Sequence, residues 1–187
     1  MKDNVAVHIA EGFEEIEAIS IIDVLRRAEI ETIVVSVTGH KEVTGSHGIS
    51  IITDILFEAV NYNEIKMIVL PGGMPGAGNL KNHEGLGRQI LNFNESKKPL
   101  GAICAAPLVF GNLGLLQNKK ATCYPGFEDQ LTGADITGNA VEISDNIITG
   151  KGAGVAIQFA LSIVEMLKGK PIAEQLADKL IYSGFKS

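Results

Sequence analysis

The sequence predicts an α/β fold in which an open, mostly parallel sheet carries helices on both faces. Segments with the apolar content of buried strands alternate with segments of helical periodicity along most of the chain. The strand segments are apolar throughout, as parallel strands tend to be. The chain has 187 residues, of which 45% are hydrophobic and 20% charged, and this suits one folded domain spanning residues 1–187.

The first elements follow one another in strand and helix order. Residues 5–10 (VAVHIA) are predicted to form a strand, and apolar residues at helical spacing predict a helix over residues 14–28. A second strand is expected over residues 32–37 (TIVVSV). Turn-forming residues lie in the middle of residues 41–54, so we expect a strand hairpin there.

The middle of the chain is organised around a short apolar strand that ends at a cysteine. Strands are predicted over residues 66–70 and 100–103, with a helix over residues 84–94 between them. Pro-Gly-Gly follows the first of these strands at residues 71–73, and Cys104 follows the second. A helical pattern begins immediately after the cysteine.

The remaining elements are shorter. The pattern predicts strands over residues 120–124, 140–143 and 146–149, the last two joined by a turn. Helices are expected over residues 155–167 and 172–182.

In a fold of this kind, ligands bind beyond the carboxyl ends of the parallel strands. Four predicted turns converge there, at residues 11–17, 71–73, 104–106 and 124–126. We therefore expect the functional site at this edge of the sheet.

The composition excludes several classes of partner. The formal net charge of −6 argues against nucleic acid, because phosphate binding needs clustered Lys and Arg. No apolar segment approaches the roughly 20 residues needed to cross a bilayer, and no basic and apolar leader precedes the first strand. We expect a cytoplasmic protein that binds neither membranes nor nucleic acid.

The sequence predicts no cofactor and no metal site. The loop GKGAG at residues 150–154 lacks the spacing of the dinucleotide and P-loop fingerprints, so we interpret it as a tight turn. The histidines are scattered, and none lies at ligand spacing with a cysteine. They are His8, His40, His47 and His83.

Cys104 is the strongest candidate for a functional side chain. A turn from a strand into a helix holds its residue in a strained backbone conformation and exposes the side chain at the sheet edge, as in nucleophile elbows. The amides of the following helix would favour the thiolate. The alternative is a structural role as a small buried hydrophobe, which is common for free cysteines.

A cysteine nucleophile usually needs a base or a charge partner within hydrogen-bond reach. Glu17 is the best candidate, because it lies at the start of a helix on the edge where Cys104 would emerge. A buried, neutral carboxyl there could hydrogen-bond the sulfur and move protons. The alternative is a solvated glutamate, and Glu14 and Glu15 could simply be surface charges that the helix dipole favours.

Four segments carry a resemblance to a known family: AEGFEEIE at residues 10–17, VLPGG at 69–73, AICAAP at 102–107 and GKGAGVAIQFALSIVE at 150–165. They occur in family order over nearly the entire chain. By these segments the sequence resembles the DJ-1/ThiJ/PfpI family, on its DJ-1-like branch. The resemblance implies a flavodoxin-like three-layer sandwich that forms a homodimer.

The resemblance also implies roles for individual residues. It implies a reactive Cys104 beside a protonated Glu17. It implies an oxyanion and substrate pocket formed by the amides of Gly73 and Ala105, with Gly72 and Tyr124 beside them.

The sequence departs from the family pattern at Tyr124. The best-known relatives carry a histidine near the cysteine, whereas a tyrosine titrates near pH 10 and is a poor base at neutral pH. Glu17 would then carry more of the proton transfer. Arg27 and His47 fall where relatives place basic residues near a dimer-related pocket, so they are expected to contact anions from the dimer side. His47 stands in place of an arginine.

Two related classes lack their defining residues here. Ala105 stands where the protease-type branch has a histidine, and the downstream H-x-E of class I glutamine amidotransferases is absent. Cys123 lies beside Tyr124 on a predicted strand, so their side chains should point to opposite faces, and we interpret Cys123 as structural.

Members of this branch are described as glutathione-independent glyoxalases, as protein deglycases acting on methylglyoxal adducts, as oxidative-stress sensors and as chaperones. We therefore expect an enzyme that acts on small dicarbonyls or glycated substrates through Cys104. The alternative is a non-enzymatic stress sensor or chaperone that works through oxidation of Cys104. A protease or a thiamine-related role is a weaker alternative.

Overall fold

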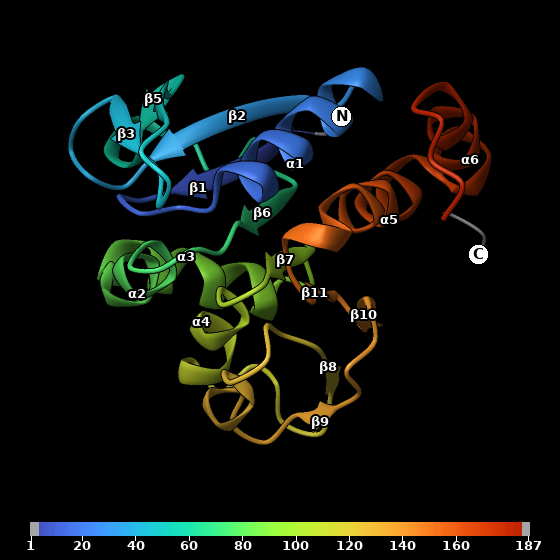
Figure 1. Cartoon of the computed structure of the whole chain (residues 1–187). Coiled ribbons are helices and arrows are strands. Elements are labelled where there is room, and N and C mark those ends of the chain that lie inside the picture. Colours follow the sequence, from blue (N-terminus) through green and yellow to red (C-terminus); the bar gives the residue numbers. More distant parts are fainter. Residues whose placement is uncertain (1–3, 185–187) are drawn as a thin grey trace.

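A seven-stranded sheet forms the centre of the computed structural model, which describes residues 4–184 (Figure 1). The strand order is β10-β11-β7-β6-β1-β2-β5, and every neighbouring pair is parallel except β10 and β11. The strands are β1 (Asn4–Ile9), β2 (Glu31–Ser36), β5 (Ile55–Leu56), β6 (Met67–Leu70), β7 (Leu100–Ile103), β10 (Val141–Ser144) and β11 (Ile147–Gly150).

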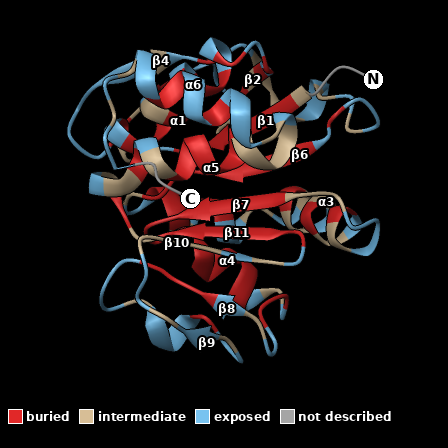
Figure 2. Cartoon of the chain, turned by 90° about the vertical axis from the view of Figure 1, so that its right-hand side faces the viewer, coloured by how far each residue is buried: buried red, intermediate tan, exposed pale blue. Residues whose placement is uncertain are grey.

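Helices cover both faces of this sheet, and the buried residues form one apolar cluster on each face (Figure 2). Strand β1 shows the alternation, because Val5 and Val7 belong to one cluster and Ala6 belongs to the other. The first cluster includes residues of α1 (Glu15–Arg27), α5 (Ala156–Lys168) and α6 (Lys170–Lys179). The second includes residues of α2 (Gly76–Asn82), α3 (Glu84–Glu95) and α4 (Pro107–Asn112).

The predicted three-layer α/β sandwich is therefore confirmed. In the part of the chain that the structure describes, three short 3₁₀ helices complete the helical elements, at Phe57–Ala59, Glu128–Gln130 and Ala153–Val155. Among residues 4–184, no helix combines the length and the apolar character needed to span a bilayer. The predictions about a leader and about the ends of the domain concern residues 1–3 and 185–187, which lie outside the described residues.

The hairpin predicted within residues 41–54 is confirmed. Strands β3 (Glu42–Thr44) and β4 (Ser50–Ile52) pair in antiparallel fashion. The hairpin docks on the loop after β1 through two backbone hydrogen bonds of 2.8 Å, from Gly12 N to Thr44 O and from Ser46 N to Phe13 O. This docking places the turn of the hairpin beside the start of α1.

Several element predictions were wrong. The strand predicted over residues 120–124 is only β8 (Lys120–Ala121), which pairs with β9 (Asp135–Ile136) outside the central sheet. The ladder ends there because the Thr122 amide donates to the Thr149 side chain instead. Helix α2 was missed because its sequence, GAGNLKN, contains two glycines and has weak helical propensity.

Two helix boundaries also differ from the prediction. Helix α4 begins at Pro107 rather than directly after Cys104, because residues 104–106 form a turn. Helix α6 begins at Lys170 and ends at Lys179. Pro171 lies within its first turn, where the missing N–H of proline costs nothing.

Candidate active site

Cys104 lies at the carboxyl end of β7, at the edge of the sheet where the sequence placed the functional site. Its backbone φ is +64°, in the left-handed region that residues other than glycine rarely adopt. The backbone is fixed on both sides, because Cys104 N donates to Gly150 O at 2.9 Å and Cys104 O accepts from Tyr124 N at 2.8 Å. The strand-to-helix elbow therefore has the strained geometry expected of it.

Glu17 is fully buried and faces Cys104 from the first turn of α1. Its Oε2 accepts a 2.8 Å hydrogen bond from Gly72 N, and its carboxyl hydrogen-bonds the Cys104 thiol. Its backbone is fixed by Glu14, whose carboxylate caps α1 by accepting from Glu17 N at 2.7 Å. This burial excludes the alternative of a solvated glutamate at position 17.

The surroundings of the pair favour their neutral forms. Burial raises the pKa of Glu17 to about 7, although the hydrogen bond from Gly72 favours the carboxylate. Burial, followed by the negative charge of an ionised Glu17, raises the pKa of Cys104 to about 12. A charge on one group thus opposes a charge on the other, so the pair carries at least one proton at neutral pH.

Backbone amides favour the Cys104 thiolate as expected, but they do not set the net direction of its pKa shift. The backbone N–H groups of Gly73 and Ala105 do hydrogen-bond the sulfur and lower the pKa of the thiol. Burial and the carboxylate of Glu17 outweigh them. Helix α4 begins only at Pro107 and is six residues long, so it contributes little dipole at the sulfur.

The amides of Gly72 and Gly73, after β6, bind different members of the pair of Glu17 and Cys104. Gly73 N points at Cys104, as an oxyanion donor should, and Gly73 has a φ of +89°. Gly72 N is taken by Glu17, so Gly72 orients the acid rather than presenting a free amide to a substrate. Ala105 is buried and supplies the second amide near the sulfur.

Tyr124 is half-exposed at the edge of the site, and its amide holds the Cys104 carbonyl. Its ring lies over Gly152, where an added Cβ would stand 3.3 Å from the ring. The neighbouring Cys123 is buried, and burial raises the pKa of its thiol to about 11. Unlike the Cys104 thiol, the Cys123 thiol has no carboxyl or amide hydrogen bond among the causes of its pKa shift, which fits the structural role expected for it.

Arg27 and His47 lie on different parts of the molecule. Arg27 is ten residues beyond Glu17, about 15 Å along α1, and its Nε donates to Asp23 at 2.6 Å. His47 lies on the hairpin turn near the start of α1. Their expected contacts with anions involve a second chain and stay a prediction.

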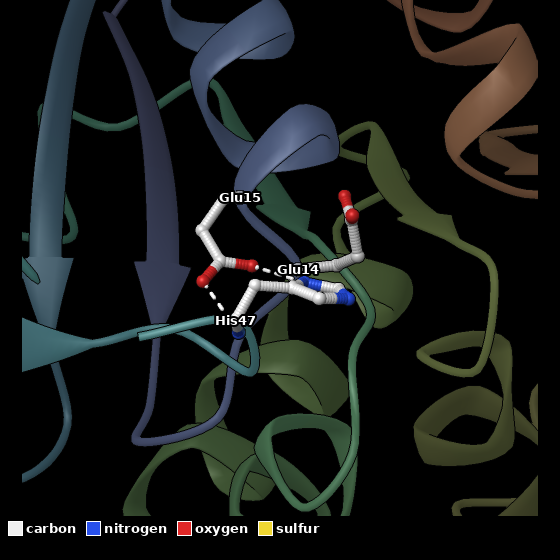
Figure 3. A group of neighbouring side chains, drawn as sticks. All are labelled: Glu14, Glu15 and His47. Carbon is white, nitrogen blue, oxygen red and sulfur yellow. Dashed lines mark hydrogen bonds and ion pairs between the residues drawn. The ribbon is translucent and has the colours of Figure 1, made fainter. Parts of the chain in front are cut away.

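Glu15 is a residue whose role sequence reasoning missed. It is buried rather than a surface charge, and its Oε1 accepts from His47 N at 2.7 Å. Glu14, Glu15 and His47 also bring ligand-type atoms within 4.8 Å of one another (Figure 3). Because these residues are about 30 positions apart in sequence, no local spacing could have revealed the group.

Comparisons with known proteins match the chain to one family. The family model described as "DJ-1/PfpI family" matches residues 3–166. Protein DJ-1 homolog B of Arabidopsis thaliana is 40% identical over 174 residues, which are 92% of this chain but only 40% of that relative's length. The chain therefore spans less than half of that relative.

Two further similarities cover most of both chains. Glutathione-independent glyoxalase DJR-1.2 of Caenorhabditis elegans is 34% identical over 161 residues, covering 85% of each protein. The solved structure of oxidized DJ-1 from Toxoplasma gondii has a TM-score of 0.92 and 40% identity, and covers 97% of this chain and 99% of its own.

Proposed function

The chain belongs to the DJ-1/PfpI family, on its DJ-1-like branch, and we propose that it is a cysteine-dependent, glutathione-independent glyoxalase acting on methylglyoxal-type dicarbonyls or their adducts on proteins. The observation that carries this proposal is the buried carboxyl of Glu17 hydrogen-bonded to the Cys104 thiol. The glyoxalase name of the C. elegans relative supports it.

The first step is addition of the thiol to the aldehyde. The Cys104 sulfur forms a bond to the aldehyde carbon of methylglyoxal, and the thiol proton passes through Glu17 to the carbonyl oxygen, giving a hemithioacetal. The amides of Gly73 and Ala105 already point at the sulfur, and they would stabilise the negative charge that develops on the oxygen.

The second step moves a proton between two carbons. Glu17, as a carboxylate, removes the hydrogen from the carbon bound to sulfur and returns it to the neighbouring carbon. The hydroxyl proton of the hemithioacetal passes to the former ketone oxygen, which leaves a thioester. Water then cleaves the C–S bond and releases lactate and the thiol. With Tyr124 in place of an imidazole, Glu17 is the acid and base in contact with Cys104, and a pKa of about 7 suits both roles.

Purified protein incubated with methylglyoxal and without glutathione is expected to form lactate, measured with lactate dehydrogenase. Cys104→Ser should reduce the rate to that of the buffer, whereas the matched Cys123→Ser variant should retain it. Lactate formation by Cys104→Ser at the wild-type rate would refute the proposal.

A second candidate function is oxidative-stress sensing, alone or with chaperone activity, through oxidation of Cys104 to a sulfinate. The observation that favours it is that Glu17 Oε1 is buried without a hydrogen-bond partner among the described residues. A protonated Oε1 could donate to an oxygen added at the sulfur. The solved T. gondii relative is named as an oxidized form.

Mild peroxide is expected to add oxygen at Cys104 before Cys123, as measured by intact mass and peptide mapping. The expected product at Cys104 is the sulfinate, a gain of two oxygen atoms, because the neutral Glu17 stabilises it. Preferential oxidation of Cys123 would count against the sensor role.

We also propose that the chain forms a homodimer through α1 and the β3–β4 hairpin. Isoleucines are exposed on both elements, including Ile16 at 60% and Ile52 at 71%. Exposed apolar side chains of this kind are typical of an interface. Light scattering is expected to give about twice the chain mass, and Ile16→Lys should shift it toward the monomer. A monomeric wild-type protein at micromolar concentration would refute the dimer.

A further inference from the structure

The turn between β3 and β4 places ligand-type side chains against the start of α1 (Figure 3). Ser46 and His47 come from the turn, and Glu14 and Glu15 come from the helix start. Figure 3 shows the carboxylate of Glu15 directed at His47, whereas the carboxylate of Glu14 is directed away from the His47 ring. These side chains lie outside the Cys104 and Glu17 pair.

Three donor atoms form a compact triangle. His47 Nδ1 lies 2.8 Å from Glu15 Oε2, Ser46 Oγ lies 3.1 Å from the same nitrogen, and Ser46 Oγ lies 3.3 Å from Glu15 Oε2. Ligands held about 2.1 Å from one tetrahedral or octahedral ion are about 3.0 to 3.4 Å apart. Two edges of the triangle, 3.1 and 3.3 Å, fall in this range. The 2.8 Å edge is the ion pair of His47 and Glu15, which would open by a few tenths of an ångström around an ion.

Backbone hydrogen bonds fix the orientation of the Glu15 carboxylate. It is buried, and its Oε1 accepts from the backbone amides of His47 at 2.7 Å and Ile49 at 3.4 Å. These bonds leave Oε2 directed at Ser46 and His47. Hydrogen bonds to the second oxygen are what orient metal ligands in proteins.

Glu14 offers a fourth donor. A ligand atom of its carboxylate lies within 4.8 Å of those of Glu15 and His47. Its Oε2 caps α1 at Glu17 N, and no partner for Oε1 is found among residues 4–184. Together the residues offer one nitrogen, two carboxylates and one hydroxyl, and the two negative charges balance a divalent ion.

We propose that Glu14, Glu15, Ser46 and His47 bind one divalent first-row transition ion, such as Zn²⁺. This mixture of imidazole and oxygen ligands suits borderline ions better than Mg²⁺ or Ca²⁺. Binding uses the Nδ1 lone pair, so the proton that lies between His47 and Glu15 leaves or moves to Nε2. The ion thus replaces that proton as the link between the hairpin turn and α1, at a position two residues before Glu17.

The test uses metal-free full-length protein carrying Cys104→Ser, which removes the competing thiol. Co²⁺ is titrated first, because its visible absorption reports tetrahedral or five-coordinate ligation, and Zn²⁺ is then titrated calorimetrically in competition. One ion per chain is expected. His47→Gln should weaken binding at least tenfold, whereas His40→Gln should not, because His40 is exposed and its side chain contacts none of these ligands.

Ser46→Ala provides a second test that leaves the buried Glu15 anchor intact, and it should also weaken binding. Circular dichroism checks that each variant is folded. Absence of Co²⁺ absorption, equal affinity of His47→Gln and His40→Gln, or binding that disappears when Cys104 is replaced would each overturn the proposal.

Discussion

Replacing Glu17 by Gln is expected to stabilise the protein at pH 8 by up to about 3 kcal/mol while it abolishes lactate formation. Burial raises the pKa of this carboxyl from 4.5 to about 7, and each unit is worth about 1.4 kcal/mol. A glutamine keeps an oxygen to accept from Gly72 N but carries no charge to be buried. It also cannot move a proton between two carbons.

The stabilisation should depend on pH in a defined direction. Below pH 4.5 Glu17 is neutral in both the folded and the unfolded chain. The free energies of unfolding of the wild type and of Glu17→Gln should therefore differ little. Between pH 4.5 and about 7 the unfolded chain ionises first, which favours unfolding of the wild type. Above that range the full difference is reached and then stays constant.

Urea unfolding of both proteins at pH 4.5, 6 and 8 measures the effect, and the methylglyoxal assay at pH 7 measures the loss of turnover, expected to be at least about 100-fold. Glu95→Gln is a matched control, since Glu95 is an exposed glutamate on α3. A stability difference that does not change with pH would show that Glu17 is not held neutral by burial.

Gly73→Ala is expected to destabilise the protein by about 2 to 5 kcal/mol, the largest loss of stability that we predict. An added Cβ would lie 2.4 Å from Glu14 N and 2.5 Å from Gly12 O. Both are backbone atoms of the loop that leads into α1, so they cannot move away cheaply. The φ of +89° adds strain of about 1 to 2 kcal/mol for any residue with a Cβ, and crowding adds a further 1 to 3 kcal/mol.

Gly78→Ala in α2 is the matched control, with the opposite sign. The nearest atom to its added Cβ is Met74 Cε at 3.7 Å, an ordinary contact, and alanine is the better helix former by about 1 kcal/mol. Thermal and urea unfolding compare the two variants with the wild type. If Gly73→Ala were as stable as Gly78→Ala, the close approach of residues 12–14 to Gly73 would be wrong.

The sequence was sufficient to locate the elbow and its partner. Cys104 follows a four-residue apolar strand, and Glu17 begins the helix after the first strand, so a parallel sheet brings both to one edge. The direction of the Cys104 pKa could not be predicted in the same way. It depends on how completely the sulfur and Glu17 are removed from water, which only the packing of α1 against residues 72–73 and 104–105 decides.

The role of Glu15 could not be predicted from the sequence either. A glutamate in the first turn of a helix is usually a solvated charge, and nothing near position 15 indicates otherwise. It is buried because the hairpin turn at residues 45–49 folds over it and donates backbone hydrogen bonds to it. Contacts between segments about 30 residues apart leave no periodic signal in either segment.

The amides of Gly72 and Gly73, after β6, limit how far substitutions elsewhere in the protein affect the active site. Gly72 N holds Glu17 and the next amide, Gly73 N, points at Cys104. The Gly72-Gly73 dipeptide therefore fixes the distance between the Glu17 carboxyl and the Cys104 thiol. Substitutions in the buried parts of the helices can change the stability of the fold while the distance between Glu17 and Cys104 stays the same. Catalytic activity and stability can therefore change separately among related sequences.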